Sequence, residues 1–324
     1  MCTMKKKFQM IGFALSVLLV TLPVVTVGAG NAAFGKQKKE KTTESALGVK
    51  PVTGSWINLA YKDVRNKYTN PQSFDNMDPK LWEAKVRELS AMGIEYLVLM
   101  EVANEGKSYY PSQIMPWWYN KDKKSPVDAI LDEAAKHNMK IFMSSGWAKD
   151  QDDNLLDPAI KERQLQIMEE LASLYKNHKA FYGWYLPVED CLCPIFAEHA
   201  VQSVNTLSEK AKKLAPGKRT LISPYGIGLS EFDNPEYEKQ MQKLKVDIIA
   251  YQDEVGCVRD QFTLPRLKKN WQRLRDIHNR LNIEMWANCE TFTWEEGTND
   301  RTSALIPAAY PAAVPAGCSI CGGG

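Results

Sequence analysis

A strand that ends in two carboxylates is predicted for the stretch Phe181-Tyr-Gly-Trp-Tyr-Leu-Pro-Val-Glu-Asp190. Its first eight residues are mostly aromatic or apolar, which is typical of a strand that is buried on both faces. A charge placed directly after a buried strand is costly unless the position requires it. In an α/β barrel, this position is the rim where active sites are built. The stretch therefore favours a barrel with Glu189 at its mouth.

The alternation of strand and helix continues on both sides of this stretch. Strands are predicted at residues 55–61, 94–100, 140–145, 181–188, 219–225, 246–253 and 283–290, and helices at 79–92, 126–138, 158–178, 194–214, 235–244 and 264–281. Such alternation indicates a parallel sheet with right-handed crossovers, and the spacing of the strands fits a (β/α)8 TIM-type barrel. The alternative is a doubly wound open sheet. A dinucleotide-binding version of that sheet is disfavoured, because no Gly-x-Gly-x-x-Gly follows the first strand.

No eighth strand is predicted. After Phe292 there is room for at most one more helix, beginning within residues 303–307, and residues 308–324 form a low-complexity tail of mainly Ala, Pro and Gly. A seven-stranded barrel leaves its first and last strands with unpaired edges, which proteins normally avoid. We therefore expect an α/β barrel whose eighth strand is missing or altered at the C-terminus. A truncated or frame-altered tail is favoured over an open barrel.

The N-terminus has the pattern of a secretory signal peptide over residues 1–33. A basic run, Lys5-Lys6-Lys7, precedes an apolar segment from Ile11 to Val27 and then a run of small residues. An uncleaved anchor helix is the alternative. Residues 34–52 are predicted to be a flexible tether and residues 53–307 the barrel domain. We expect an exported protein (periplasmic, cell-surface or secreted) with no stable membrane span after signal cleavage.

Composition limits the functional classes. The 324 residues are 44% hydrophobic and 25% charged, with a net charge of +2, so nothing in the overall charge points to nucleic acid. Nine Trp and thirteen Tyr provide rings suited to carbohydrate, although ordinary cores use them too. The four His fall in helical patterns, and there is no His-Glu-x-x-His, Gly-x-Ser-x-Gly or Walker motif. We expect no metal and no cofactor.

Acidic residues follow four of the predicted strands: Glu101 the second, Glu189 and Asp190 the fourth, Asp253 and Glu254 the sixth, and Glu290 the seventh. The fourth and seventh strands lie across the mouth of a barrel from one another. Two carboxylates that face each other in this way are what glycoside hydrolysis requires. We therefore predict Glu189 and Glu290 as the catalytic pair. The alternative for any single acid is a helix N-cap or a loop salt bridge.

Rings and polar groups near other strand ends are candidates for binding a saccharide. The predicted substrate-binding residues are Asn58, Glu101, Trp117, Trp118, Trp147, Tyr225, Tyr251, Asp253, Trp286 and Asn288. Because strand side chains alternate in direction, Glu290, Asn288 and Trp286 should share one face. An alternative for Trp147 and Trp286 is that they plug the barrel.

The chain resembles a family of exported bacterial domains of unknown function in the TIM-barrel glycoside hydrolase superfamily. The residues that carry this resemblance are Trp56-Ile-Asn-Leu-Ala-Tyr61 with Asp63 and Arg65, Tyr185-Leu-Pro-Val-Glu189, and Trp286-Ala-Asn-Cys-Glu290, within the region from Thr53 to Pro307. The resemblance implies a barrel whose catalytic acids follow the fourth and seventh strands. The best-known members of the superfamily have Asn before the fourth-strand acid, where this chain has Val188.

These observations predict an exported glycoside hydrolase that acts on a poly- or oligosaccharide with retention. Glu189 would be the general acid/base and Glu290 the nucleophile, with Asp253 or Glu101 binding substrate or tuning their pKa values. Two other functions stay open. One is a carbohydrate-binding barrel without catalysis, and the other is a scaffold or interaction protein.

Overall fold

The computed structural model describes residues 51–59, 77–147, 155–188, 194–255 and 263–290, and the backbone of two short strands at 293–294 and 304–305. The predicted signal peptide, the tether up to residue 50, the tail 308–324 and the candidate acid Glu189 lie outside the described residues.

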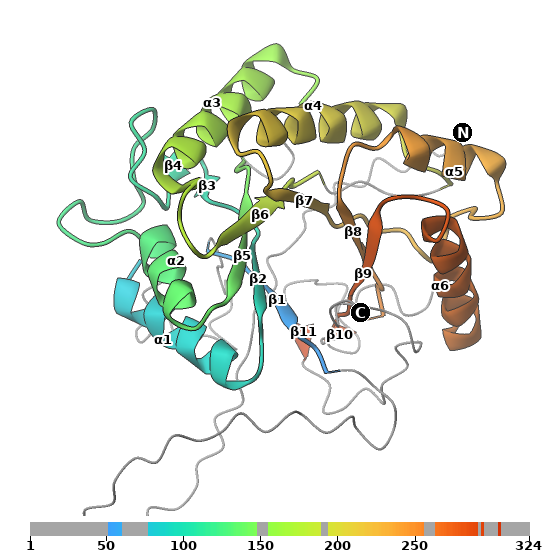
Figure 1. Cartoon of the computed structure of the whole chain (residues 1–324), viewed down its shortest axis with the longest axis horizontal. Coiled ribbons are helices and arrows are strands. Elements are labelled where there is room, and N and C mark those ends of the chain that lie inside the picture. The colour runs from blue at the N-terminus through green and yellow to red at the C-terminus, as the bar shows by residue number, and fades with distance from the viewer. Residues whose placement is uncertain are drawn as a thin grey trace, which may run out of the picture.

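Seven strands form one curled sheet with helices along its outside (Figure 1). In sheet order they are β1 (Gly54–Ile57), β2 (Tyr96–Leu99), β5 (Lys140–Ser144), β6 (Phe181–Tyr185), β7 (Arg219–Ile222), β8 (Ile248–Gln252) and β9 (Glu284–Asn288). Every neighbouring pair is parallel. The predicted TIM-type α/β fold is confirmed. Among the described residues, no eighth strand joins this sheet.

Six helices connect the strands: α1 (Pro79–Ala91), α2 (Pro126–Lys136), α3 (Pro158–Tyr175), α4 (Glu198–Leu214), α5 (Pro235–Lys243) and α6 (Leu264–His278). Five of them begin with an N-cap residue whose side chain accepts a hydrogen bond from a backbone N–H of the first turn. These N-cap residues are Asp78, Ser125, Asp157, Asn234 and Thr263. The exception is α4, which begins later than its predicted start at Pro194 and has no side-chain cap. No helix in the described segments has the length and hydropathy that crossing a bilayer requires.

Two short hairpins were not predicted. The strands β3 (Ala103–Asn104) and β4 (Lys107–Ser108) pair antiparallel, and Glu105 and Gly106 turn between them with positive φ. The strands β10 (Thr293–Trp294) and β11 (Ala304–Leu305) also pair antiparallel. The helix predicted to begin within residues 303–307 is therefore wrong at Ala304–Leu305. Two-residue strands are too short to show alternation, so the sequence pattern did not reveal them.

Aromatic rings fill the interior of the curled sheet. Trp286 of β9 meets Tyr96 of β2 at 5.2 Å and Phe142 of β5 at 5.7 Å between ring centroids, both edge to face. Tyr182 of β6 meets Tyr96 at 5.8 Å and Phe142 at 5.3 Å. These strands are not all neighbours in the sheet, so the contacts must cross its concave side. We call Tyr96, Phe142, Tyr182 and Trp286 the interior ring cluster. It links the β9 edge of the sheet to β2 on the far side of the opening.

Charged side chains tie this cluster together at the amino ends of the strands. Glu284 accepts hydrogen bonds from Trp286 Nε1 and from Arg219, each at 2.6 Å. Lys140 Nζ donates to the Tyr96 hydroxyl at 2.8 Å and lies 4.6 Å from the centroid of that ring. This is the face of a barrel where residues serve stability.

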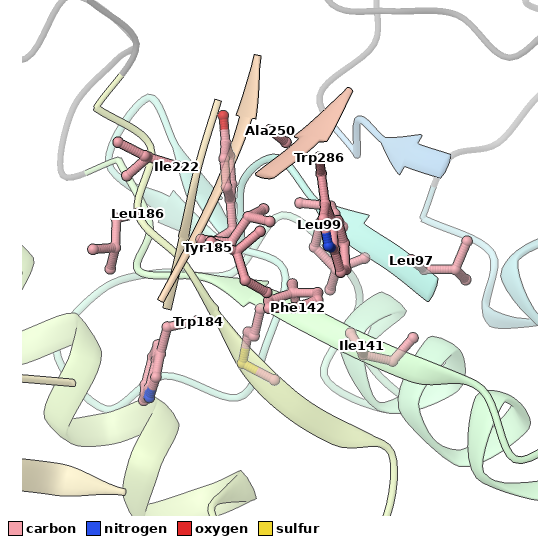
Figure 2. Packing of buried hydrophobic residues seen from close by; sticks show 14 of the residues in the cluster. Leu97, Leu99, Ile141, Phe142, Trp184, Tyr185, Leu186, Ile222, Ala250 and Trp286 are labelled. Carbon is pink, nitrogen blue, oxygen red and sulfur yellow. The ribbon is translucent and has the colours of Figure 1, made fainter. Parts of the chain in front are cut away.

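Gly183 shows why the opening stretch needs a glycine in a strand. A Cβ at this position would lie 2.6 Å from the Phe142 ring and 2.6 Å from the Arg219 carbonyl oxygen. The neighbouring side chains Trp184 and Tyr185 extend to opposite sides of β6 (Figure 2). The strand therefore packs on both faces, and the glycine leaves room for the Phe142 ring.

Replacing Trp286 with Ala should lower the free energy of unfolding by about 3–5 kcal/mol, because it empties the centre of the interior ring cluster. Denaturant titration measures this change. The control is Leu174→Ala, since Leu174 is 48% exposed on α3 and its truncation should cost no more than about 0.5 kcal/mol. Equal losses in the two variants would contradict a central role for the cluster.

Candidate active site at the carboxyl edge of the sheet

Four carboxylates are buried where the parallel strands end. Glu101 follows β2 and is 0% exposed, Asp253 and Glu254 follow β8 at 8% each, and Glu290 follows β9 at 7%. Acidic side chains are rarely buried so completely, and a group of them at one edge of a sheet is typical of a functional site. Within the described residues, no cluster of His, Cys, Asp and Glu is arranged to hold a metal.

Asp253 determines where Glu290 sits. Its Oδ1 accepts the backbone N–H of Glu290 at 3.0 Å and that of Val255 at 3.2 Å. Its own N–H donates to the Asn288 carbonyl at 3.0 Å, so β8 and β9 stay joined beyond their last paired residues. Burial raises the pKa of Asp253 to about 6, against the opposing effect of these N–H donors. Asp253 is therefore a positioning residue for Glu290.

Glu254 holds the loop after β7. Its Oε2 accepts the Gly226 N–H at 2.8 Å, and the backbone N–H groups of Ile227 and Gly228 also donate to this side chain. Burial nevertheless raises the pKa of Glu254 to about 7. Its backbone has φ +55, in the left-handed region that non-glycine residues seldom adopt. Glu254 therefore fixes a loop of the rim, and its carboxylate is already occupied there.

Amide side chains line the same edge. Asn288 donates to the Ser223 hydroxyl at 3.1 Å, and Gln252 donates to the Ser223 carbonyl at 2.9 Å. Asn288 was predicted, whereas Ser223 and Gln252 were missed. The available signal was a polar residue at the end of an otherwise apolar strand, where apolar packing does not require one.

Tyr251 does not reach the rim. It is fully buried, its hydroxyl lies 2.9 Å from His278 Nε2, and its ring meets Trp271 of α6 edge to face. His278 Nδ1 faces the Ile283 carbonyl at 2.8 Å and must donate to it, so Nε2 accepts from Tyr251. Burial lowers the pKa of His278 to about 4, which keeps the ring neutral. Tyr251 is thus a packing residue between sheet and helix, and its predicted substrate role is corrected.

Trp117 and Trp118 lie in the long loop between β2 and α2. Their indole N–H groups donate to the carbonyls of Ser112 at 2.7 Å and Asn104 at 3.0 Å. Trp117 stacks on Tyr119, and Trp118 stacks on Tyr109. A lysine ammonium lies over each indole, from Lys121 and Lys107 respectively. Both rings are therefore engaged within their own loop.

Glu170 of α3 anchors this loop. Its carboxylate accepts hydrogen bonds from the Tyr110 hydroxyl at 2.8 Å, the Ser112 hydroxyl at 2.6 Å and the Gln113 N–H at 2.6 Å. Burial, and the hydrogen bond to Glu170, raise the pKa of Tyr110 well above its ordinary value. No sequence pattern indicated this role, because Glu170 lies within a helix and its partners are more than 50 residues away in the chain.

The other predicted residues are placed as follows. Trp286 belongs to the interior ring cluster, as the plug alternative requires, and its N–H is bound to Glu284. Asn58 and Tyr225 are half-buried after β1 and β7, and Trp147 is buried after β5. The pKa of Tyr109 is raised mainly by the burial of its hydroxyl and, in second place, by the nearby charge of Glu101. Backbone hydrogen bonds bring together Asp253, Asn288 and Glu290.

Residues 52–314 match the protein family described as "Domain of unknown function (DUF4434)". No curated protein has a significantly matching sequence. The fold is similar to that of a candidate alpha-L-fucosidase from Bacteroides thetaiotaomicron VPI-5482, with 18% identity, a TM-score of 0.60 and coverage of 86% of this chain and 84% of that chain. It is also similar to beta-galactosidase from the psychrophilic Marinomonas ef1, with 11% identity, a TM-score of 0.50 and coverage of 79% of this chain and 50% of that one. At these identities the likeness shows the TIM-barrel fold.

Between pH 4 and 7 the free energy of unfolding should fall as pH rises. Asp253 and Glu254 keep their protons up to about pH 6 and 7 when folded, whereas the unfolded chain releases them near 3.8 and 4.5. The folded state then binds more protons than the unfolded state in this window, so raising the pH favours unfolding. Denaturant titrations at pH 5 and 8 measure the difference. It should shrink in Glu254→Gln, and an unchanged difference would contradict the shifted pKa.

Glu170→Ala should lower the free energy of unfolding by at least about 2 kcal/mol, because it leaves the hydroxyl donors of Tyr110 and Ser112 without their acceptor. Both residues belong to the loop between β2 and α2, which we call the aromatic loop. Limited proteolysis should also cut the loop at Lys121 faster. Glu169→Ala is the matched control. Glu169 is the preceding residue in the chain, its side chain is 54% exposed, and within the described structure it pairs only with Lys210. If Glu169→Ala and Glu170→Ala behave alike, Glu170 does not anchor the loop.

Proposed function

This chain belongs to the DUF4434 family, and we propose that it is an exported glycoside hydrolase that acts on a poly- or oligosaccharide with retention of configuration. Glu290 is the nucleophile and Glu189 is the general acid/base. The N-terminal pattern of a basic run, an apolar segment and small residues supports export.

The observation that carries this proposal is the setting of Glu290. Its carboxylate is buried at the end of β9, and its backbone N–H is held by Asp253 at 3.0 Å. A nucleophile for glycosyl transfer must be held within a small range of positions, because misplacement by one ångström sacrifices much of the rate. A surface acid used only for solubility would need no such support.

Glu189 comes four residues after the end of β6 in the sequence, and β6 is the strand that contains Gly183 and Tyr185. Between β6 and β9 the sheet has two further strands, β7 and β8, so the two acids would approach each other across the mouth. A separation of about 5–5.5 Å between their carboxyl groups fits retention, and about 6.5–9.5 Å would instead fit inversion.

The reaction proceeds in two steps. Glu189 donates its proton to the glycosidic oxygen while the bond from that oxygen to the anomeric carbon breaks, and Glu290 forms a bond to the same carbon. Glu189, now a carboxylate, takes a proton from water. The water oxygen attacks the anomeric carbon and displaces Glu290, which restores both acids. Asp253 contributes by fixing the position of Glu290.

Glu290→Gln and Glu189→Gln should each lower kcat on aryl glycosides by about a hundredfold to ten-thousandfold. Both variants should keep most of their saccharide affinity, measured by calorimetry. The control is Glu209→Gln on α4, whose side chain is 59% exposed and which should leave kcat unchanged. Azide should restore activity to Glu290→Ala, because the small anion takes the place of the lost nucleophile. The product should be a glycosyl azide of inverted configuration.

The same experiment separates the other two functions. A carbohydrate-binding barrel would bind saccharides without turnover in the unmodified protein. A scaffold or interaction protein would show no saccharide affinity. Either outcome overturns the hydrolase proposal.

A further inference from the structure

Buried indole N–H groups without an acceptor are present in the described part of the chain. They belong to Trp56, Trp147 and Trp184. An unsatisfied buried donor raises the free energy of the folded state, so native proteins keep few of them and each calls for an explanation.

Two of these three tryptophans belong with the apolar core. Trp184 is a member of that core, meets Phe181 edge to face at 5.0 Å, and extends to the opposite side of β6 from Tyr185 (Figure 2). Trp56 packs partly buried against the same core. The apolar burial of their rings offsets the unsatisfied N–H.

Trp147 differs from both. Only 6% of it is exposed, and it is one of the buried hydrophobic residues, but it is not a member of the contiguous cluster of described residues that contains Trp184. It follows β5 at the carboxyl edge of the sheet, the edge that carries Asp253 and Glu290.

The backbone that leads to Trp147 is held in place. The Ser145 N–H donates to the Tyr185 carbonyl at 2.9 Å, so β5 stays joined to β6 up to that residue. Gly146 has φ +87, and a Cβ there would lie 2.9 Å from Ile167 of α3. Gln164 of α3 donates to the Ser145 hydroxyl at 3.0 Å and to the Gly146 carbonyl. Trp147 thus begins beside β6, the strand that leads to Glu189.

The other indoles predicted to bind substrate have used their donors. Trp117 donates to Ser112, Trp118 to Asn104 and Trp286 to Glu284. Trp147 is the one of these four whose N–H has no acceptor in the described structure. An N–H that is already shielded from water has no desolvation cost when a ligand oxygen reaches it. The hydrogen bond that it then forms adds directly to the affinity for the ligand.

We propose that Trp147 is a specificity-determining residue whose indole N–H donates a hydrogen bond to a hydroxyl oxygen of the bound saccharide. This role rests on the proposed function. It adds a hydrogen-bond donor to the saccharide site, whereas a ring that only stacks on a sugar supplies none. It also distinguishes the residue from a tryptophan that only plugs the barrel, because a plug requires the ring and not the N–H.

The test is Trp147→Phe, which keeps an aromatic ring and removes the N–H. Affinity for the best substrate saccharide, measured by calorimetry in the Glu290→Gln background, should fall about tenfold, and KM in the active enzyme should rise by a similar factor. Trp184→Phe makes the same chemical change in the apolar core and should alter neither quantity. Denaturant titration of both variants checks that they fold.

A second measurement follows the indole N–H signals by ¹H–¹⁵N NMR. The Trp147 signal, assigned by its loss in Trp147→Phe, should move downfield when the saccharide is added, while the Trp184 signal stays in place. A Trp147 signal that is already downfield in the free protein would show that a bound water accepts the bond, and would overturn the proposal.

The outcomes separate this inference from the proposed function. If the unmodified protein hydrolyses saccharides and Trp147→Phe has an unchanged KM, the inference fails and the hydrolase stands. If Trp147→Phe weakens binding while Glu290→Gln retains full turnover, the inference stands and the catalytic assignment fails. If no saccharide is bound, both are overturned.

Discussion

The edge-to-face contact between Tyr96 and Trp286, 5.2 Å apart, is the interaction on which the rest of this structure depends. It joins β9, at one edge of the sheet, to β2, the strand next to the other edge, across an interior where the described residues provide no eighth strand to complete the hydrogen bonding. A curled sheet without ring closure would be free to splay. Packing of interior rings resists this motion because aromatic pairs gain about 0.5–1.5 kcal/mol beyond their burial.

This arrangement separates stability from chemistry along the strands. At the amino ends, Arg219 pairs with Glu284 and Lys140 donates to the Tyr96 hydroxyl, so the charged groups there serve packing. At the carboxyl ends, Asp253 and Glu254 are buried and form no ion pair within the described residues, and burial raises the pKa of each. Groups held at a cost in stability are typical of a site prepared for a ligand.

Much of the fold was predictable. Apolar strands, helix caps and prolines at helix starts are local signals, and they located the seven strands and six helices to within a few residues. Glu101, Asp253, Glu254, Asn288 and Glu290 do lie at strand ends, because chain direction alone places them at one edge of a parallel sheet, whereas Glu189 lies outside the described residues. Tyr251 was misassigned because a position near the end of a strand does not reveal on which side a ring packs. Glu170 and Gln252 were missed because their roles come from partners distant in the chain.

By itself, the sequence determined the order of the elements, the parallel sheet and the edge at which the carboxylates gather, since these follow from periodicities of two and 3.6 residues. Only the tertiary structure decided that Asp253 holds Glu290, that Glu170 anchors the aromatic loop and that the Trp147 donor is left without an acceptor. The physical reason is the separation in sequence between the residues that form these contacts. A hydrogen bond requires two atoms within about 3 Å, and for residues far apart in the chain that distance exists only after the sheet has curled.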